Sequence, residues 1–370
     1  MPTLQLSHWQ LDAVRLPYAR AVAWSDIVED AATFLVLRLS AREGAQGVAE
    51  ITVKPTWMGH GVRSLVASLQ EVLLPLLAGC DLLDVQAVRS RLDAIPEQHA
   101  GKALIDNALW DLRAGAGGQA LWPAMGPRRV PVSVTITRQE PARMVAEAVD
   151  WVERHGLRTL KVKGGQGRTQ DLEVLRLLRS ALGGSVRFYV DANSAYPPAE
   201  AADYARAIHE AGAVVVEDPC AFAPDAHFSA LQAAVPCPLL VDFPCTSLRD
   251  AAGFIAAGAR AFSLKPGRFG LSMTRDLLAL ADQAGALTVV GMFGESALGT
   301  WHALSLAARQ GSHALPAEVT WYLSMREQVV HQVPEIRDGQ VRLPESISVA
   351  AMLDGERLAR RSFFHLEQSA

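Results

Sequence analysis

The chain has 370 residues, half of them hydrophobic, so it can bury one large core and a smaller one, because a single core seldom extends past about 250–300 residues. Its 35 lysines and arginines nearly balance its 39 aspartates and glutamates. No basic run or acidic tail indicates a nucleic-acid or membrane-surface partner, which leaves a small-molecule partner as the expectation.

The sequence also predicts a cytoplasmic protein. The N-terminus lacks the basic segment and apolar run of a signal peptide, and no stretch of about 18 uncharged apolar residues could span a membrane. The cysteines show no CxxC spacing, as expected in a reducing compartment. They are Cys80, Cys220, Cys237 and Cys245.

Residues 1–128 combine strand and helix patterns. The alternating runs "FLVLRLSA" (34–41) and "GVAEITV" (47–53) predict strands, whereas "GVRSLVASLQEVLLPLLAG" (61–79) and "GKALIDNALWDLRAGAGG" (101–118) have helical spacing. We therefore expect an α+β domain over this part of the chain.

Residues 129–325 repeat one rhythm, in which a short apolar run is followed by a polar turn and a segment with helical spacing. Alternation of this kind predicts right-handed crossovers and a parallel sheet. Eight runs, with no GxGxxG turn opening the series, favour a closed (β/α)8-type barrel over an open doubly wound sheet. The runs are "VPVSVTI", "TLKVK", "RFYVDAN", "AVVVEDP", "PLLVDF", "AFSLKP", "LTVVGM" and, more weakly, "AEVTWYL".

Residues 326–370 are too few to fold alone. They include the strand-like "GQVRLP", and we expect this tail to pack against the N-terminal domain.

Charged residues occur at the carboxyl ends of the predicted barrel strands, so their side chains should meet on one face of the barrel, where sites on this fold are built. Burying so many charges without compensation would be unfavourable by several kcal/mol each, so a metal ion or mutual pairing is expected. These residues are Lys163, Asp191, Glu217, Asp242, Lys265, Glu295 and Glu318.

Three carboxylates come from consecutive strands, namely Asp191, Glu217 and Asp242. Hard oxygen ligands without His or Cys suit Mg²⁺, which keeps its other positions for water or substrate oxygens. The alternative is that these carboxylates pair with the nearby lysines in a purely structural network.

Lys161 and Lys163 stand two residues apart on one strand and so face the same way, into the barrel mouth. Two neighbouring ammonium groups disfavour each other's charge, which predicts a lowered lysine pKa and a usable base. Lys265 lies four strands further on, across the barrel. A substrate carbon held between them would meet one lysine on each side.

These residues resemble a known family. The motifs "KVK", "VDAN", "VEDP", "VDF" and "LKPG", in this order, resemble the enolase superfamily and its muconate-lactonizing subgroup. "IDNALWDLRA" (105–114) resembles the family's helix leading into the barrel, and "GVAE" with Glu50 resembles its capping-domain turn. The resemblance implies a (β/α)7β barrel, with an α+β capping domain that is built from the N-terminus and the C-terminal tail.

The resemblance also implies a chemistry. Mg²⁺, with Mn²⁺ as a possible substitute, would be held by the three carboxylates, and Lys163 and Lys265 would be the acid/base catalysts. Lys161 would hold the substrate carboxylate and tune Lys163. The expected enzyme removes the proton α to a carboxylate through an enediolate, as a racemase, epimerase or cycloisomerase. Relatives are often symmetric assemblies, so a homo-oligomer is expected.

Other residues are assigned by the same resemblance. Asn193 would support the metal or Lys163, or would simply end its strand. Glu295 and Ser296, in "GMFGESALGT", resemble the "ES-x-x-G" of muconate cycloisomerases and of the N-acylamino-acid racemase and succinylbenzoate synthase branch. Glu318, in "PAEVT", stands where the cycloisomerases also carry a glutamate. Capping-domain loops could close over the site and exclude water, and they carry Trp24, Trp57 and Met58.

The sequence departs from the subgroup pattern at two places, which narrows the range of expected substrates and site networks. Phe243 follows Asp242 where subgroup members commonly carry an acidic residue, and strand eight lacks the DxD of dipeptide epimerases. Two alternatives stay open: a dehydratase that performs syn β-elimination on a hydroxy acid or hydroxyproline-type substrate, and an inactive barrel that serves as a binding protein.

Overall fold

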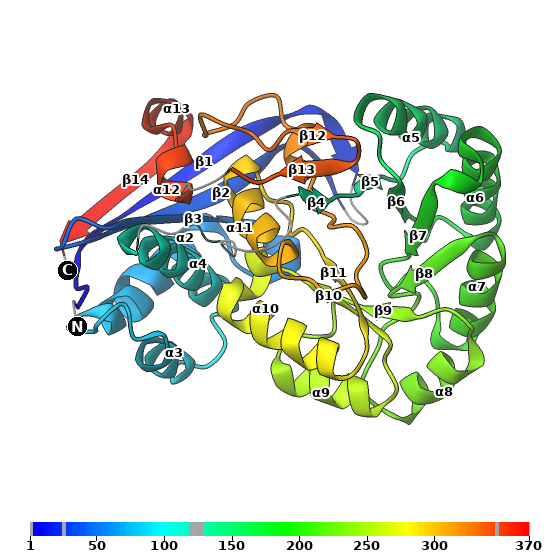
Figure 1. Cartoon of the computed structure of the whole chain (residues 1–370), viewed down its shortest axis with the longest axis horizontal. Coiled ribbons are helices and arrows are strands. Elements are labelled where there is room, and N and C mark those ends of the chain that lie inside the picture. Colours follow the sequence, from blue (N-terminus) through cyan, green and yellow to red (C-terminus); the bar gives the residue numbers. More distant parts are fainter. Residues whose placement is uncertain (1–2, 24–26, 118–120, 122–128, 345–347, 370) are drawn as a thin grey trace.

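The computed structural model describes residues 3–23, 27–117, 121, 129–344 and 348–369. A four-stranded antiparallel sheet with its helices lies beside a curled parallel sheet that is surrounded by helices (Figure 1). The (β/α)7β barrel with an α+β capping domain is confirmed. Among the described residues no helix is long and apolar enough to cross a membrane.

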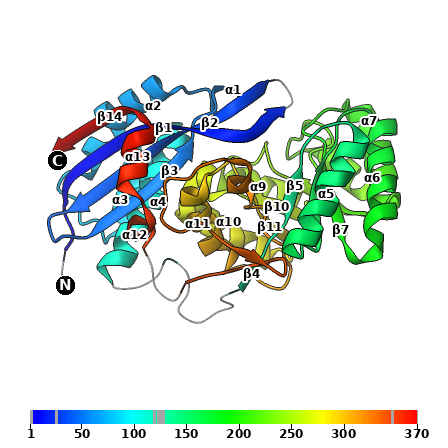
Figure 2. The same ribbon diagram turned by 90° about the horizontal axis from the view of Figure 1, so that it is seen from above.

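The capping sheet has the strand order β14-β1-β2-β3, so the C-terminal strand pairs with the first strand of the chain. Its strands are β1 (Leu6–Ala23), β2 (Val28–Ala41), β3 (Gln46–Thr52) and β14 (Ser362–Ser369). The β1–β2 hairpin runs from this sheet toward the barrel (Figure 2), where Arg20 donates to Glu147 of a barrel helix at 2.8 Å.

Side chains of β2 alternate between two faces, and both faces are buried. Leu35 and Leu37 face the capping helices, whereas Phe34 and Val36 belong to the core shared with the barrel. The helices are α1 (Pro55–Met58), α2 (Val62–Ser68), α3 (Val85–Asp93) and α4 (His99–Ala116), with a π-helix at Leu69–Leu73 and a 3₁₀-helix at Leu74–Leu77.

Seven parallel strands form the barrel sheet, in the order β11-β10-β9-β8-β7-β6-β5. Their bounds are β5 (Val134–Ile136), β6 (Thr159–Lys163), β7 (Arg187–Asp191), β8 (Ala213–Glu217), β9 (Leu239–Val241), β10 (Ala261–Leu264) and β11 (Leu287–Val290). The register places Lys163 opposite Asp191 and Asp191 opposite Glu217. These three predicted strand-end residues therefore lie side by side at the same level of the sheet.

The expected eighth strand is reduced to single bridges. Ala314 bridges Thr288 of β11, and Ala317 bridges Val132 just before β5, so this segment closes the barrel. The rest of "AEVTWYL" is not a strand, because a 3₁₀-helix begins at Trp321 and ends at Ser324.

Each barrel strand is followed by a helix on the outside of the sheet (Figures 1 and 2). α5 has Pro141 in its first turn and is followed by Gly156, whose φ of 65° suits the residue after a helix C-terminus. The helices are α5 (Pro141–His155), α6 (Arg168–Leu182), α7 (Pro198–Glu210), α8 (Ala226–Ala234), α9 (Leu248–Ala256), α10 (Pro266–Gln283) and α11 (Ala297–Ala307), with a 3₁₀-helix at Gly183–Ser185.

The chain returns from the barrel to the capping sheet through short elements. A small antiparallel sheet has the order β12-β13-β4, and two helices then lead to β14. The returning elements are β12 (Ile336–Arg337), β13 (Gln340–Arg342), α12 (Val349–Met352) and α13 (Gly355–Arg361), and β13 pairs with β4 (Arg129–Pro131), which precedes the barrel.

Candidate active site

Lys161 lies at the centre of the charged strand ends. Its side chain is 2% exposed, and its Nζ lies 3.1 Å from Oδ2 of Asp191, 2.8 Å from Oε2 of Glu217 and 3.0 Å from Oε2 of Glu318. Two carboxylates from the ends of β7 and β8 and a third from the segment that closes the barrel thus surround one buried ammonium group. Thr135 on β5 donates to Oε1 of Glu318 at 2.5 Å and fixes the far side of this cluster.

Lys163 reaches further toward the opening of the barrel. Its Nζ donates to Oδ2 of Asp191 at 2.6 Å and to Oδ1 of Asn193 at 3.2 Å. Asn193 has a φ of 49°, and its backbone N–H donates to Oδ1 of Asp191 at 2.9 Å. The strained turn after β7 therefore holds both the carboxylate and the lysine.

Lys265 follows β10 and directly precedes α10. Its Nζ donates to Oδ2 of Asp242 at 2.5 Å. Gly291, at the end of β11, leaves room for the lysine stem, since a Cβ there would lie 3.1 Å from Cε of Lys265. β10 and β6 are four positions apart in the curled sheet, so the two lysines come from well-separated parts of the barrel wall.

One cavity of about 300 Å³ collects these groups. Its polar floor contains all three lysines and several of their partners, whereas aromatic side chains line its wall. The polar residues include Lys161, Lys163, Lys265, Asp242, Asn193 and Glu318, and the aromatic ones are Trp57, Phe243 and Phe293.

The capping domain contributes Trp57, on α1, to this cavity. Its ring lies 5.5 Å from that of Phe293, which follows barrel strand β11. Met58 instead packs against the capping core, and Trp24 lies outside the described residues. Of the loop residues named from the sequence, Trp57 is thus the one that the structure places at the site.

A lowered lysine pKa was expected from the neighbouring pair Lys161 and Lys163, and for Lys161 this expectation is wrong. Burial alone would lower the pKa of Lys161, but attraction by Asp191, Glu217 and Glu318 outweighs it, and the pKa is raised well above its ordinary value. The pKa of Lys265 is raised mainly by Asp242, against the opposing effect of burial. The acids around these two ammonium groups therefore determine the direction of both pKa shifts.

The carboxylates carry more negative charge than the lysines balance. Burial, followed by repulsion from Asp191 and Asp242, raises the pKa of Glu217 well above its ordinary value. The pKa of Asp191 is instead lowered, because Lys161 and Lys163 outweigh its burial. An excess of buried carboxylate oxygens at adjacent strand ends fits a hard divalent cation.

The lysines, however, occupy these carboxylates in the structure. Among the described residues, no group of three or more His, Cys, Asp or Glu side chains is already arranged as metal ligands. Asp191 and Glu217 are held by Lys161, and Asp242 by Lys265. The donor chemistry and charge suit magnesium, and the ammonium groups are what a cation would have to displace.

Glu295 and Ser296 are buried after β11 and do not line the cavity; Ser296 instead contacts the capping domain. Ser296 donates its backbone N–H and its hydroxyl to Glu50 of β3, at 2.7 and 2.5 Å. Glu295 accepts from the backbone N–H of Phe293 at 2.6 Å, whereas its other oxygen is buried without a hydrogen-bond partner. Burial raises the pKa of both Glu50 and Glu295 to about 7.

The contact between Glu50 and Ser296 predicts how stability depends on pH. In the folded chain Glu50 keeps its proton up to about pH 7, whereas in the unfolded chain it ionises near 4.5, so the wild type loses stability as the pH rises through this window. Glu50→Gln has no proton to lose. Urea unfolding at pH 5 and 7.5 should show its stability relative to wild type improving by on the order of 3 kcal/mol. Parallel pH profiles for both proteins would refute this.

Asp218 and Arg268 are among the residues of the site that were not predicted from the sequence. Asp218 accepts backbone N–H groups of Asp242 at 3.3 Å and Phe243 at 2.9 Å, so it sets the turn after β9. Arg268 donates to the backbone oxygen of Phe243 at 2.9 Å and lines the cavity. Their positions, next to Glu217 and three residues after Lys265, were the available signals.

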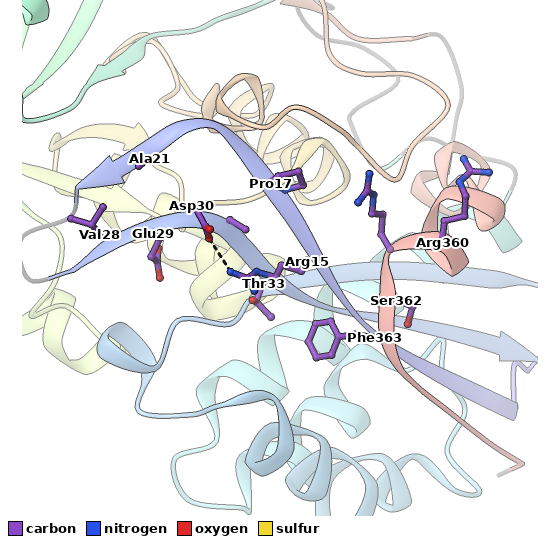
Figure 3. Close-up of a pocket in the computed structure, with 12 residues that line it drawn as sticks. Arg15, Pro17, Ala21, Val28, Glu29, Asp30, Thr33, Arg360, Ser362 and Phe363 are labelled. Carbon is purple, nitrogen blue, oxygen red and sulfur yellow. Dashed lines mark hydrogen bonds and ion pairs between the residues drawn. The ribbon is translucent and has the colours of Figure 1, made fainter.

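A larger groove, of about 1170 Å³, lies elsewhere, between the β1–β2 hairpin and the start of β14 (Figure 3). It is lined by Arg15, Asp30 and Phe363 among others, and Arg15 donates to Asp30 at 2.8 Å. None of the strand-end lysines or carboxylates borders it. The smaller cavity is therefore the candidate active site.

Comparison with known proteins agrees with this geometry. Residues 13–126 match the mandelate racemase/muconate lactonizing enzyme N-terminal domain, and residues 143–349 match the enolase C-terminal domain-like family. The chain belongs to the enolase superfamily. Within it, the chain falls in the muconate-lactonizing subgroup.

Curated relatives of this superfamily member are enzymes. An N-succinylamino acid racemase from Thermus thermophilus is 31% identical over 357 residues, covering 93% of this chain and 94% of the relative. A chloromuconate cycloisomerase from Delftia acidovorans is 29% identical, covering 93% and 95%. The chain is accordingly an enzyme, and these relatives place it among the superfamily's isomerases.

Solved structures confirm the fold over nearly the whole chain. The muconate lactonizing enzyme from Pseudomonas fluorescens, complexed with muconolactone, has a TM-score of 0.89 at 24% identity and covers 98% of this chain and all of its own. An N-succinyl Arg/Lys racemase from Bacillus cereus has a TM-score of 0.90 at 20% identity, with the same coverage.

Proposed function

We propose that this enzyme removes the proton α to a substrate carboxylate and returns a proton to the resulting enediolate, as a racemase, epimerase or cycloisomerase. The observation that carries the proposal is the pair Lys163 and Lys265, which come from separated strands and border one cavity. A carbon acid held between two lysines can lose a proton to one and gain a proton from the other.

Lys163 and Lys265 have complementary roles in the proposed reaction, one removing a proton and the other delivering one. The one that lacks its proton acts as the base, taking the α-proton while the C–H electron pair moves into the enediolate. The other, in its ammonium form, delivers a proton to the α-carbon, which inverts the configuration if delivery is from the opposite side. Lys161 is buried among acids and remains charged, so we assign it to holding the substrate carboxylate.

Asp191, Glu217 and Asp242 are the residues proposed to hold a magnesium ion, with manganese as a substitute. Such an ion would supply positive charge that stabilises the enediolate. Around it, Asn193 orients Asp191 and Lys163 through hydrogen bonds of 2.9 and 3.2 Å. Trp57 covers the cavity from the capping domain and limits access of water.

The test is solvent exchange. The protein is incubated in D₂O with MgCl₂ and a panel that includes both enantiomers of N-succinylamino acids and cis,cis-muconate, and α-deuterium is followed by NMR and mass spectrometry. We expect metal-dependent deuterium incorporation into at least one carboxylate, abolished by EDTA. Loss of water in step with turnover would identify a dehydratase instead. Magnesium-dependent thermal stabilisation without exchange anywhere in the panel would indicate a binding protein.

A further inference from the structure

The mouth of the active-site cavity carries an unusually exposed aromatic side chain. Phe243, directly after Asp242, is 60% exposed although it lines the cavity that contains the lysines. Leaving a phenyl ring in water forgoes the stabilisation that burial would give. A bound molecule that covers the ring would recover it.

The position of Phe243 is fixed from two directions. Its backbone N–H donates to Asp218 at 2.9 Å, and its backbone oxygen accepts from Arg268 at 2.9 Å. The guanidinium of Arg268 also lies 5.1 Å from the Phe243 ring centre and 4.7 Å from that of Phe269. The ring therefore rests on a held arginine and loses little further freedom when a ligand binds.

The wall of the cavity beyond Phe243 is also aromatic and apolar. Trp57 and Phe293 line it as a tilted pair with centres 5.5 Å apart, and Met292 adds a polarizable surface. The charged floor and this apolar wall lie in one cavity of about 300 Å³. A ligand that fills both needs a carboxylate at one end and a flat, apolar group at the other.

We propose that Phe243 is a specificity-determining residue, and that the enzyme prefers carboxylates whose substituent beyond the α-carbon is flat and apolar. The orientation of the substrate, with its carboxylate toward the lysines, rests on the proposed function. Contact between two aromatic groups favours binding by about 2- to 10-fold beyond simple burial, and Arg268 beneath the ring keeps the platform in place.

The experiment compares two ligands that differ by one phenyl ring, N-succinyl-L-phenylalanine and N-succinyl-L-alanine. Dissociation constants are measured by titration calorimetry with MgCl₂ present, for the wild type, Phe243→Ala, Phe243→Leu and Phe243→Tyr. The wild type should prefer the phenylalanine derivative. Phe243→Ala should reduce that preference by about 3- to 10-fold, Phe243→Leu should reduce it less, and Phe243→Tyr should preserve it.

A matched control is available in the groove of Figure 3. Phe363 is 59% exposed, almost the same as Phe243, but lies on β14 and lines the other hollow. Phe363→Ala should leave the preference unchanged. Equal loss of both ligands in Phe243→Ala, equal affinity of the wild type for both, or no measurable binding of either would overturn the proposal.

The proposed reaction and this specificity fail separately. Binding that depends on Phe243, without α-deuterium exchange of any carboxylate, would refute the proposed reaction and support the role of Phe243 in specificity. Exchange that shows the same preference for the phenylalanine derivative in wild type and Phe243→Ala would support the reaction and overturn the role of Phe243 in specificity.

Discussion

Replacing either lysine of the proposed acid/base pair should abolish turnover but leave exchange on one side of the substrate. Lys163→Ala should stop α-deuterium exchange of one enantiomer and Lys265→Ala that of the other, because each base reaches only the proton on its own side, within roughly 3 Å. Each affected rate should fall on the order of 10²–10⁴-fold. NMR of each enantiomer in D₂O with MgCl₂ measures both rates.

The control for this experiment is Lys102→Ala. Lys102 lies on α4 of the capping domain, where its ammonium donates to the backbone oxygen of Ile95, and its loss should leave exchange intact. A lopsided result, with one lysine essential and the other modest, would indicate a cycloisomerase or dehydratase. If both variants exchanged both enantiomers at wild-type rates, neither lysine would be the base.

The second large effect concerns the three carboxylates. Asp191→Asn, Glu217→Gln and Asp242→Asn should each lose activity together with the thermal stabilisation that MgCl₂ gives the wild type. A ligand at 100 times its dissociation constant stabilises the folded state by about 2.7 kcal/mol, so the loss is visible as a smaller shift in Tm. Differential scanning fluorimetry with and without MgCl₂ makes the measurement.

Without metal the same variants should remain folded. Burial, followed by repulsion from neighbouring acids, already raises the pKa of Glu217, so Glu217→Gln removes a charge that the site poorly accommodates. Asp203→Asn, at an exposed aspartate on α7 paired with Arg206, is the control and should keep both activity and the magnesium shift. A variant of the three that retains the shift would not be a metal ligand.

Much of the architecture was predictable from periodicity alone. Strands β6, β7 and β8 each end in a charged residue and are each followed by one helix, which is why the spacing from Lys163 to Asp191 to Glu217 brought these residues to one level. The long β1 and the C-terminal β14 were not predicted. Pro17 interrupts the apolar alternation of β1, and in β14 most side chains remain exposed, so neither shows the pattern of a buried strand.

Other features depend on contacts between distant parts of the chain. Glu50 and Ser296 are 246 positions apart, and only the docking of the two domains makes them partners. The raised pKa values of Lys161 and Lys265 likewise reflect how many carboxylates each ammonium meets in space. Strand order showed that the lysines and acids share a face of the barrel. It did not show that the acids determine the direction of the pKa shift of Lys161 and Lys265.

The most direct test of the account is a crystal structure with MgCl₂ and a carboxylate that the enzyme exchanges. We predict a cation bound by Asp191, Glu217 and Asp242, and an α-carbon between the Nζ atoms of Lys163 and Lys265, about 3–3.5 Å from each. A cation bound elsewhere, or both lysines on the same side of the α-carbon, would contradict this prediction.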